Sequence, residues 1–441
     1  MSASPVLRPH VLIFTIALAA CGGGGADDGG GAAGSGSLDG PDRAIDPQTE
    51  DVFTVGALEG EVWETFGTIA GVAFDPQGNL YVLDRDAAHI VKFSPTGEFV
   101  RTIGRKGDGP GELSGPMGLS ILPDGRIVVF DIAKQAFEVF DANGDFDESV
   151  SRNPEEGFPG RVLLPTPDGR LATHGVMRIS FGDGDASIEE PEGRPIELFG
   201  LDGASEVAYT AWEPPAPEGE ESSELGSGNR RMVIRMQQTV AFEPQVQLGV
   251  LSDGRLAVVD SIGYRVKLVE GGMASETLER PIAPTVVDEG IMEMERQRRL
   301  DALEDGGGGS GRMIVIGGNA SAGSGGGGMS VGRDQINEMM RGQIENMAFA
   351  DAIPVIADLK VDWDDRIWIE RSGARPGEDG PTDIVTPGGT YLGTIAPDGL
   401  RIPDAFGPDG LIAHIEADEL EVQRVRVARL AGDEALESGR R

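Results

Sequence analysis

Residues 69–84, IAGVAFDPQGNLYVLD, decide the fold. They consist of an apolar stretch, a polar turn that contains Gly78, and a second apolar stretch that ends in Asp84. Two apolar stretches around a short Gly-containing turn are typical of a β-hairpin, and we expect a tight primed turn because Gly tolerates positive φ. The stretch therefore predicts the first two antiparallel strands of a sheet.

The same pattern recurs five more times along the chain. The turn position of the six copies is occupied by Gly78, Gly125, Gly169, Gly254, Asp365 and Gly410. Successive turns are 47, 44, 85, 111 and 45 residues apart, so the base period is about 45 residues, the size of one four-stranded propeller blade. The gap of 85 residues fits either one blade with an insertion or two blades of which one is degraded. We favour an insertion at 211–230, which is acidic and rich in Pro and Gly.

The sequence therefore predicts an all-β fold, a six-bladed β-propeller. The sixth copy lacks a fourth strand before the chain ends, whereas residues 51–56, DVFTVG, are strand-like and precede the first blade. We expect the propeller to span 49–432 and to be closed by this N-terminal strand, since closure removes open sheet edges. Residues 433–441 are expected to be a disordered tail.

A small helical insertion is expected at 284–350, between blades four and five. Residues 287–304 are rich in helix formers, 334–348 have apolar residues at helical spacing, and a Gly-rich run at 306–328 separates them. The apolar positions of the second helix are Ile336, Met339, Met340, Ile344 and Met347. Packing onto the ring explains this stripe, and an adaptable Met-rich recognition surface is the alternative.

The N-terminus predicts export. Residues 1–20 have the charge, the short apolar run and the small residues of a signal peptide. Leu18-Ala19-Ala20-Cys21 resembles the lipobox of bacterial lipoproteins, a resemblance that makes Cys21 the lipid attachment site and, with Gly22 next to it, favours the outer membrane facing the periplasm. A plain secretory signal followed by an incidental cysteine is the alternative. Residues 21–48, Gly-rich at the start, are expected to be a flexible tether.

Three stretches resemble repeats of a known family. Residues 69–84 are similar to an NHL-type repeat, as are the blade-joining residues 103–113, IGRKGDGPGEL, and the stretch 352–368 at the entry of the fifth blade. The chain thus resembles bacterial six-bladed β-propeller lipoproteins with NHL-type repeats. The resemblance is good over 50–150 and 350–430, weak over 175–350, and implies a fold and a compartment.

The charge balance excludes one class of partner. Asp and Glu number 74 against 37 Lys and Arg, which gives a net charge of −37. Nucleic-acid binding requires cations that displace phosphate counterions, so no nucleic-acid partner is expected. Arg101, Arg105 and Lys106 form a short basic patch, for which a solvated face is the favoured interpretation.

Catalytic and metal-binding motifs are not found in the sequence. Outside the signal, the histidines are His89, His174 and His414, which fall in different blades, and no metal-ligand spacing occurs. No Gly-x-Ser-x-Gly elbow is present, so no catalytic residues, metal ligands or cofactor are assigned. Residues 141–152 resemble a calcium loop only faintly, since Phe146 replaces the required Gly, and a hairpin turn is predicted instead.

Three aspartates end the second strand of a blade: Asp84, Asp131 and Asp260. In NHL-like repeats such an Asp accepts hydrogen bonds from the turn that follows, and we expect that structural role here.

Two functional hypotheses remain. The first is a membrane-tethered, non-catalytic binding or scaffolding module in the cell envelope, which holds a protein partner or a small ligand on a propeller face. The alternative is a metal-dependent, lactonase-like propeller hydrolase or lyase with a divalent cation in the central channel. Convergence of three or more Asp, Glu, Asn or His side chains at one mouth of the channel would favour the enzyme.

Overall fold

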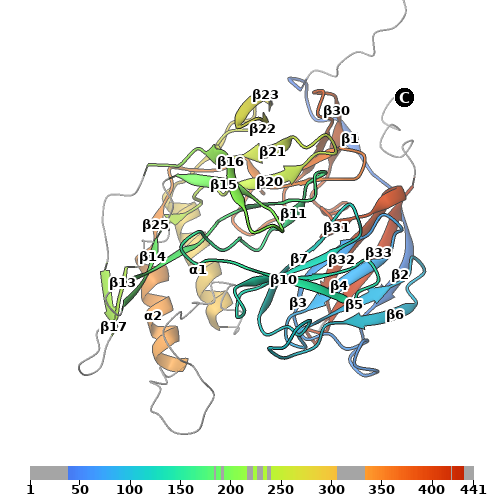
Figure 1. Ribbon diagram of the computed structural model, residues 1–441. Helices are drawn as coiled ribbons and strands as arrows, with labels where there is room; N and C mark the ends of the chain where they lie inside the picture. The colour runs from blue at the N-terminus through green and yellow to red at the C-terminus, as the bar shows by residue number, and fades with distance from the viewer. Residues whose placement is uncertain are drawn as a thin grey trace, which may run out of the picture. The chain divides into compact units, whose positions relative to one another are not determined.

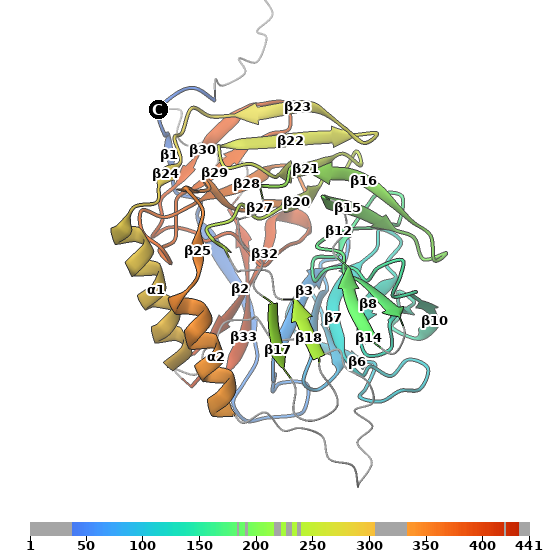
Figure 2. The same ribbon diagram turned by 90° about the vertical axis from the view of Figure 1, so that its left-hand side faces the viewer.

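The computed structural model describes residues 38–182, 185–189, 193–215, 222–225, 232–235, 240–304, 333–418 and 420–431. Most of their strands form six sheets, each built on four antiparallel strands and one of them extended by a fifth, arranged around an axis (Figures 1 and 2). The fold is a six-bladed β-propeller. The predicted signal peptide, Cys21, the Gly-rich run at 306–328 and the tail at 433–441 lie outside the described residues.

The first three blades follow one another along the chain. The first comprises β3 (Ile69–Phe74), β4 (Leu80–Asp84), β5 (His89–Phe93) and β6 (Phe99–Ile103). The second comprises β7 (Pro116–Ile121), β8 (Ile127–Asp131), β9 (Ala136–Phe140) and β10 (Phe146–Ser151). The third comprises β11 (Leu164–Pro165), β12 (Leu171–His174), β15 (Arg194–Phe199) and β16 (Ser205–Ala211).

The other three blades complete the ring. The fourth comprises β20 (Gln247–Val250), β21 (Leu256–Val259), β22 (Arg265–Glu270) and β23 (Met273–Glu279). The fifth comprises β27 (Ile356–Val361), β28 (Ile367–Arg371), β29 (Thr382–Val385) and β30 (Tyr391–Ile395). The sixth comprises β31 (Ala405–Phe406), β32 (Leu411–Ala417), β33 (Gln423–Leu430) and, from the N-terminal side, β2 (Thr49–Val55); the 3-10 turn η1 (Pro408–Gly410) joins β31 to β32.

In the first blade, the turn between β3 and β4 is built around Asp75. The carboxylate of Asp75 accepts the backbone N–H of Gln77 and of Asn79, and the hydroxyl of Tyr81, at 2.9–3.0 Å. The N–H of Gly78 donates to the carbonyl of Asp75, and within the turn only Gly78 has positive φ, at 80°. The expected primed turn, with positive φ at its first central residue, is therefore wrong: this is a four-residue turn that places the left-handed residue last.

Six clusters of buried apolar side chains fill the six interfaces between neighbouring blades. All five residues of strand β4 are buried, because the strand lies between two neighbouring blades. Leu80 and Val82 pack against the sixth blade, while Tyr81 and Leu83 pack against the second. Successive side chains of a strand point to opposite faces, so a strand between two sheets is apolar throughout. Each buried Leu or Val contributes about 1.5–3 kcal/mol.

The N-terminal strand closes the ring. Strand β2 pairs antiparallel with β33 and becomes the outermost strand of the sixth blade. Val55 enters the apolar cluster between the sixth and first blades, and Asp51 forms an ion pair with Arg426 at 2.9 Å. The predicted closure is therefore confirmed.

Residues 38–48, which the sequence analysis assigned to the tether, lie against the ring. Strand β1 (Ala44–Ile45) adds to the fifth blade in parallel with β30. Arg280, whose side chain is 3% exposed, donates to the carbonyls of Leu38 and Gly40 and pairs with Asp42 at 2.9 Å and with the fully buried Asp383 at 2.7 Å. The predicted boundary at 48 is too late because two backbone carbonyls and the carboxylate of Asp42 in this segment bind a buried arginine, which no apolar pattern reveals.

The gap of 85 residues holds one blade, as expected, but the additional residues form two separate insertions rather than one. A hairpin of β13 (Arg178–Gly182) and β14 (Asp185–Glu189) lies between the second and third strands of the third blade. A second hairpin, β17 (Ser222–Leu225) and β18 (Met232–Arg235), lies in the connection to the fourth blade. Of these four strands only β17 falls within 211–230, the region where the insertion was predicted.

The helical insertion contains α1 (Glu289–Glu304) and α2 (Arg333–Glu345), which contact each other. Its base is closed by β24 (Thr285–Val286) paired with β26 (Ala352–Ile353), and β25 (Ala348–Phe349) pairs with β19 (Val240–Ala241) from the preceding connection. Within the apolar stripe Met347 is buried and Met340 and Ile344 are half-buried, which favours packing; the side chains of Ile336 and Met339 lie outside the described residues.

Candidate functional site

All the long connections of the ring leave from one end. In a four-stranded antiparallel blade, the link from strand two to strand three and the link from strand four to the next blade open at the same end. The insertions at 175–193, 212–246 and 280–355 all belong to these links, so they gather at one end, which faces the viewer in Figure 2. We call it the insertion end. The opposite end, the turn end, carries the tight turns.

A pocket of about 300 Å³ opens at the insertion end, between the third and fourth blades. We call it the blade 3–4 pocket. One wall comes from the two ends of the β13–β14 insertion and the other from the connection to the fourth blade. Its lining residues are His174, Gly175, Val176, Gly193, Arg194, Pro195, Glu213, Glu243, Gln245 and Val246. The volume lies at the lower end of the range for small-ligand sites.

Arg194, the first residue of β15, is the cation of the pocket. Its guanidinium donates to the backbone carbonyls of Pro244 and Trp212, and burial lowers its pKa, against the charges of Glu243 and Glu213. Across the part of the chain that the structure describes, no carboxylate lies within ion-pair distance of Arg194. The pocket therefore contains a partly desolvated positive charge that two neutral acceptors position but do not neutralise.

His174, the last residue of β12, is neutral near pH 7. Burial, and then the charge of Arg194, lower the pKa of its imidazole below the usual 6.5. Neither ring nitrogen forms a hydrogen bond with any residue in the described ranges. A neutral imidazole offers one donor and one acceptor, so His174 can bind a ligand without adding charge to the pocket.

The other two histidines lie elsewhere in the ring, as the sequence indicates. His89 begins β5 in the first blade, where burial lowers its pKa against the opposing effect of Asp84. His414 lies in β32, where burial, Arg401 and Arg426 lower its pKa to about 4, against opposing effects of Asp404 and Glu416. In both, Nε2 is buried and has no partner among the described residues.

The pKa of His414 predicts a pH-dependent loss of stability. In the unfolded chain the imidazole of His414 has the usual pKa near 6.5, whereas in the folded chain its pKa is about 4. The free energy of unfolding should therefore be highest above pH 6.5 and fall by about 3 kcal/mol as the pH drops to 4. In urea unfolding between pH 7.5 and 4.5, His414→Gln should flatten this decrease. Parallel curves for the two chains would contradict the assignment.

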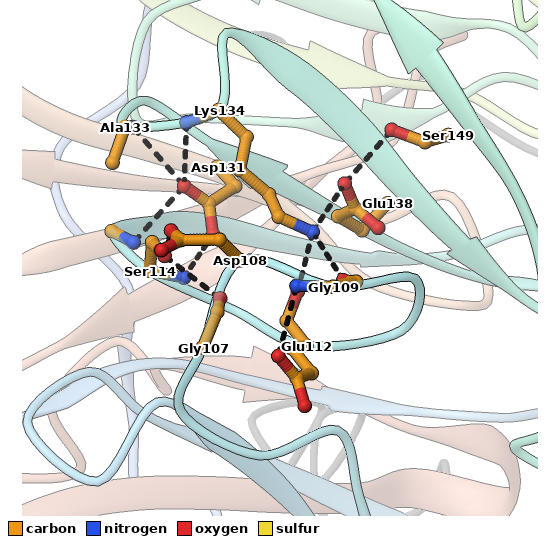
Figure 3. A network of polar contacts seen from close by, with 11 residues as sticks. Gly107, Asp108, Gly109, Glu112, Ser114, Asp131, Ala133, Lys134, Glu138 and Ser149 are labelled. Carbon is orange, nitrogen blue, oxygen red and sulfur yellow. Dashed lines mark hydrogen bonds and ion pairs between the residues drawn. The ribbon is translucent and has the colours of Figure 1, made fainter.

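The aspartates that end the second strands mainly hold loops. Asp131 accepts the N–H groups of Ser114, Gly115, Ala133 and Lys134 at 2.6–3.1 Å (Figure 3). Asp84 does the same in the first blade, with the N–H groups of Gly67, Asp86 and Ala87. The expected structural role is seen at both positions.

Lys134 shows how completely this loop is fixed. Its ammonium donates to the carbonyls of Gly109 and Glu112 and to the buried carboxylate of Glu138, at 2.8–3.0 Å (Figure 3). All three donors of the ammonium are thus used by the protein, so Lys134 fixes the loop 104–115 and has no donor left for a ligand.

Asp260 differs from its counterparts. It accepts the N–H of Trp212 at 2.8 Å and pairs with Lys267 at 2.8 Å. The carbonyl of Trp212 in turn accepts a hydrogen bond from the guanidinium of Arg194. Asp260 therefore anchors the wall of the blade 3–4 pocket rather than a turn of its own blade.

The other residues that the sequence singled out either form separate ion pairs or belong to a turn. Arg101 pairs with Asp145 of the second blade and Arg105 with Glu112, so each carries its own counter-ion. Asp141 accepts the N–H groups of Asn143 and Asp145 in the turn between β9 and β10, which is the predicted hairpin.

The donor set for a metal is not assembled in the described residues. Among them no three His, Cys, Asp or Glu side chains are grouped so that they could hold a metal ion. The channel metal that the enzyme hypothesis requires therefore has no set of three such ligands there. In the same part of the chain no helix is long and apolar enough to cross a membrane.

Comparison with known proteins supports the fold. A family described as "6-bladed beta-propeller" matches residues 65–151, which include all of the first two blades. A comparison with curated protein sequences gives no match.

Similar solved structures include a protein from Bacteroides fragilis described as exported, 11% identical, with a TM-score of 0.44 and coverage of 89% of this chain and 96% of that one. A gluconolactonase from Xanthomonas campestris is 11% identical, with a TM-score of 0.39 and coverage of 89% and 98%. A PQQ-bound aldose sugar dehydrogenase from Streptomyces coelicolor is 15% identical, with a TM-score of 0.37 and coverage of 88% and 100%. Identities this low do not indicate what this chain binds.

Proposed function

We propose that this chain is a lipid-anchored, non-catalytic binding propeller of the bacterial cell envelope, and that it binds at its insertion end. The observation that carries the proposal is the gathering of the three long insertions at one end of the ring, around the blade 3–4 pocket. In a rigid scaffold, long loops on one face are where binding residues concentrate.

The anchor rests on the sequence. Cys21 directly follows the apolar run, and residues 22–37 separate it from the first described residue, Leu38, which Arg280 holds against the ring. With a Gly-rich composition, a segment of that length spans about 20–25 Å root-mean-square. This distance is enough to keep the propeller clear of lipid headgroups. An outer-membrane position facing the periplasm is part of the proposal.

The insertion end is built as one connected surface. Ala241 and Phe349 are register partners in the pairing of β19 with β25, and Phe242 packs its ring 6.1 Å from that of Phe349. The residues that follow, Glu243 and Gln245, line the pocket. The base of the helical insertion therefore supports the wall of the pocket. The helices and the pocket are thus parts of one surface that a partner could contact together.

Photo-crosslinking in intact cells tests this proposal. Benzoylphenylalanine would replace Trp212 or Met294, which are about 40% exposed at the insertion end, or Asp124 or Asp202, which are exposed at the turn end. We expect discrete crosslinked adducts from the first pair and none from the second. Equal adducts from both ends, or adducts from the turn end alone, would contradict the proposal.

A further inference from the structure

The blade 3–4 pocket brings opposite charges together in a small space. Arg194 supplies a positive charge, Glu213 and Glu243 supply two negative charges, and His174 is neutral. We propose that this pocket binds a small zwitterion, a molecule with one carboxylate and one ammonium group, such as a free amino acid. The inference rests on the proposed binding function and names its ligand class.

Arg194 would bind the carboxylate. Its two hydrogen bonds go to neutral backbone carbonyls, and in the described part of the chain no acidic side chain forms an ion pair with it. A guanidinium has five N–H donors, so donors remain after these two contacts. A desolvated guanidinium with spare donors recognises a carboxylate through charge-assisted hydrogen bonds.

Glu213 and Glu243 would bind the ammonium group. Both line the same pocket as Arg194, and among the described residues neither has a Lys or Arg within ion-pair distance. Their two negative charges would repel a dicarboxylate or a phosphate, because like charges in a confined site are costly. One cation and two anions therefore favour a ligand that carries both signs over a polyanion.

The size of the pocket and His174 narrow the ligand further. A volume of about 300 Å³ corresponds to about ten water-sized groups, which suits an amino acid. The imidazole of His174, with no partner in the described residues, can accept from the ammonium group or donate to a polar side chain of the ligand. Val176 and Val246 supply an apolar side of the wall.

Isothermal titration calorimetry on the full chain tests the ligand class. The twenty common amino acids are titrated first, followed by the N-acetyl and amide derivatives of the tightest binder. We expect at least one amino acid to bind, and each derivative to bind about tenfold or more weakly, because each loses one charged hydrogen-bonding group. Binding of none, or binding of a derivative as tightly as of its parent, would overturn the proposal.

Variants assign the two halves of the pocket. Arg194→Gln should weaken the amino acid about tenfold or more. Because this variant also alters the hydrogen bonds to Trp212 and Pro244, the double variant Glu213→Gln with Glu243→Gln is the second measurement. It should weaken the free amino acid, whereas its N-acetyl derivative, which has no ammonium group, should bind as tightly as before or more tightly. Arg265→Gln with Glu279→Gln, an exposed ion pair on the outer strands of the fourth blade, is the matched control and should change neither.

The two proposals can fail separately. Crosslinks at the insertion end without binding of any amino acid would overturn the proposed ligand class but would still support the insertion end as the binding face. Amino-acid binding without crosslinks would support the pocket and limit the propeller to small ligands.

Discussion

A chain in which Thr49–Val55 is replaced by seven Gly and Ser residues should no longer unfold in one cooperative thermal transition. The replacement leaves β33 as an open edge and removes Val55 and Phe53 from the cluster between the sixth and first blades. A fully buried side chain such as Val55 contributes about 1.5–3 kcal/mol, and the half-buried Phe53 adds to it; a typical domain is held together by only about 5–15 kcal/mol. Differential scanning calorimetry would show the loss.

A rearranged chain provides the sharpest control. The N–H of Ala431 donates to the carbonyl of Gln48 at 2.8 Å, so the end of β33 lies beside the start of β2. Appending the sequence of Thr49–Val55 after residue 431 through a short turn should restore the transition, because closure requires the strand and not its position along the chain. The same Gly and Ser replacement at residues 26–32 should have no effect. An unclosed chain that melts like the intact one would show that the ring does not depend on β2.

Cys21→Ser should move the protein from the detergent phase to the aqueous phase in a Triton X-114 partition experiment. Each buried CH₂ of an acyl chain contributes about 0.8 kcal/mol to membrane binding. The acidic composition offers no electrostatic attraction to anionic lipids. Without acyl chains on Cys21, the proposed anchor is lost, so we expect the change to be nearly complete.

Labelled palmitate gives a second readout for Cys21. The unsubstituted chain should incorporate the label and Cys21→Ser should not, while Ser37→Ala, in the same Gly-rich stretch, should behave as the unsubstituted chain. Detergent-phase partition of Cys21→Ser equal to that of the unsubstituted chain would remove the anchor from the proposed function. The crosslinking and calorimetric tests of the insertion end would be unaffected.

The ring could be predicted because its signals are local and repeated. Each blade carries a turn residue such as Gly78, and closure follows from the missing last strand of the sixth blade. The β13–β14 hairpin was missed because its turn signal, Asp183-Gly184, falls outside the spacing of the six repeat copies. The order of residues 38–48 was missed because hydrogen bonds to Arg280, the short pairing of β1 with β30 and two isolated apolar contacts, of Leu38 and Ile45, hold them, and none of these forms a repeated pattern.

The blade 3–4 pocket could be predicted only in part. The sequence drew attention to His174 but could not distinguish it from His89 and His414. Arg194 begins an ordinary strand, and Glu243 lies far along the chain from it. They share a pocket because the connection to the fourth blade folds back over the third, which is a property of the whole ring. No spacing in the sequence encodes that proximity.

The clamp formed by Arg280 has a mechanical consequence. A pull on the chain from the N-terminal side of Leu38 meets the carbonyls of Leu38 and Gly40 and the carboxylate of Asp42, all held by one guanidinium between the fourth and fifth blades. Only beyond β1 does the chain reach β2. The clamp therefore takes up tension before the closing strand does, and force arriving from the proposed lipid anchor would act first on the fourth and fifth blades.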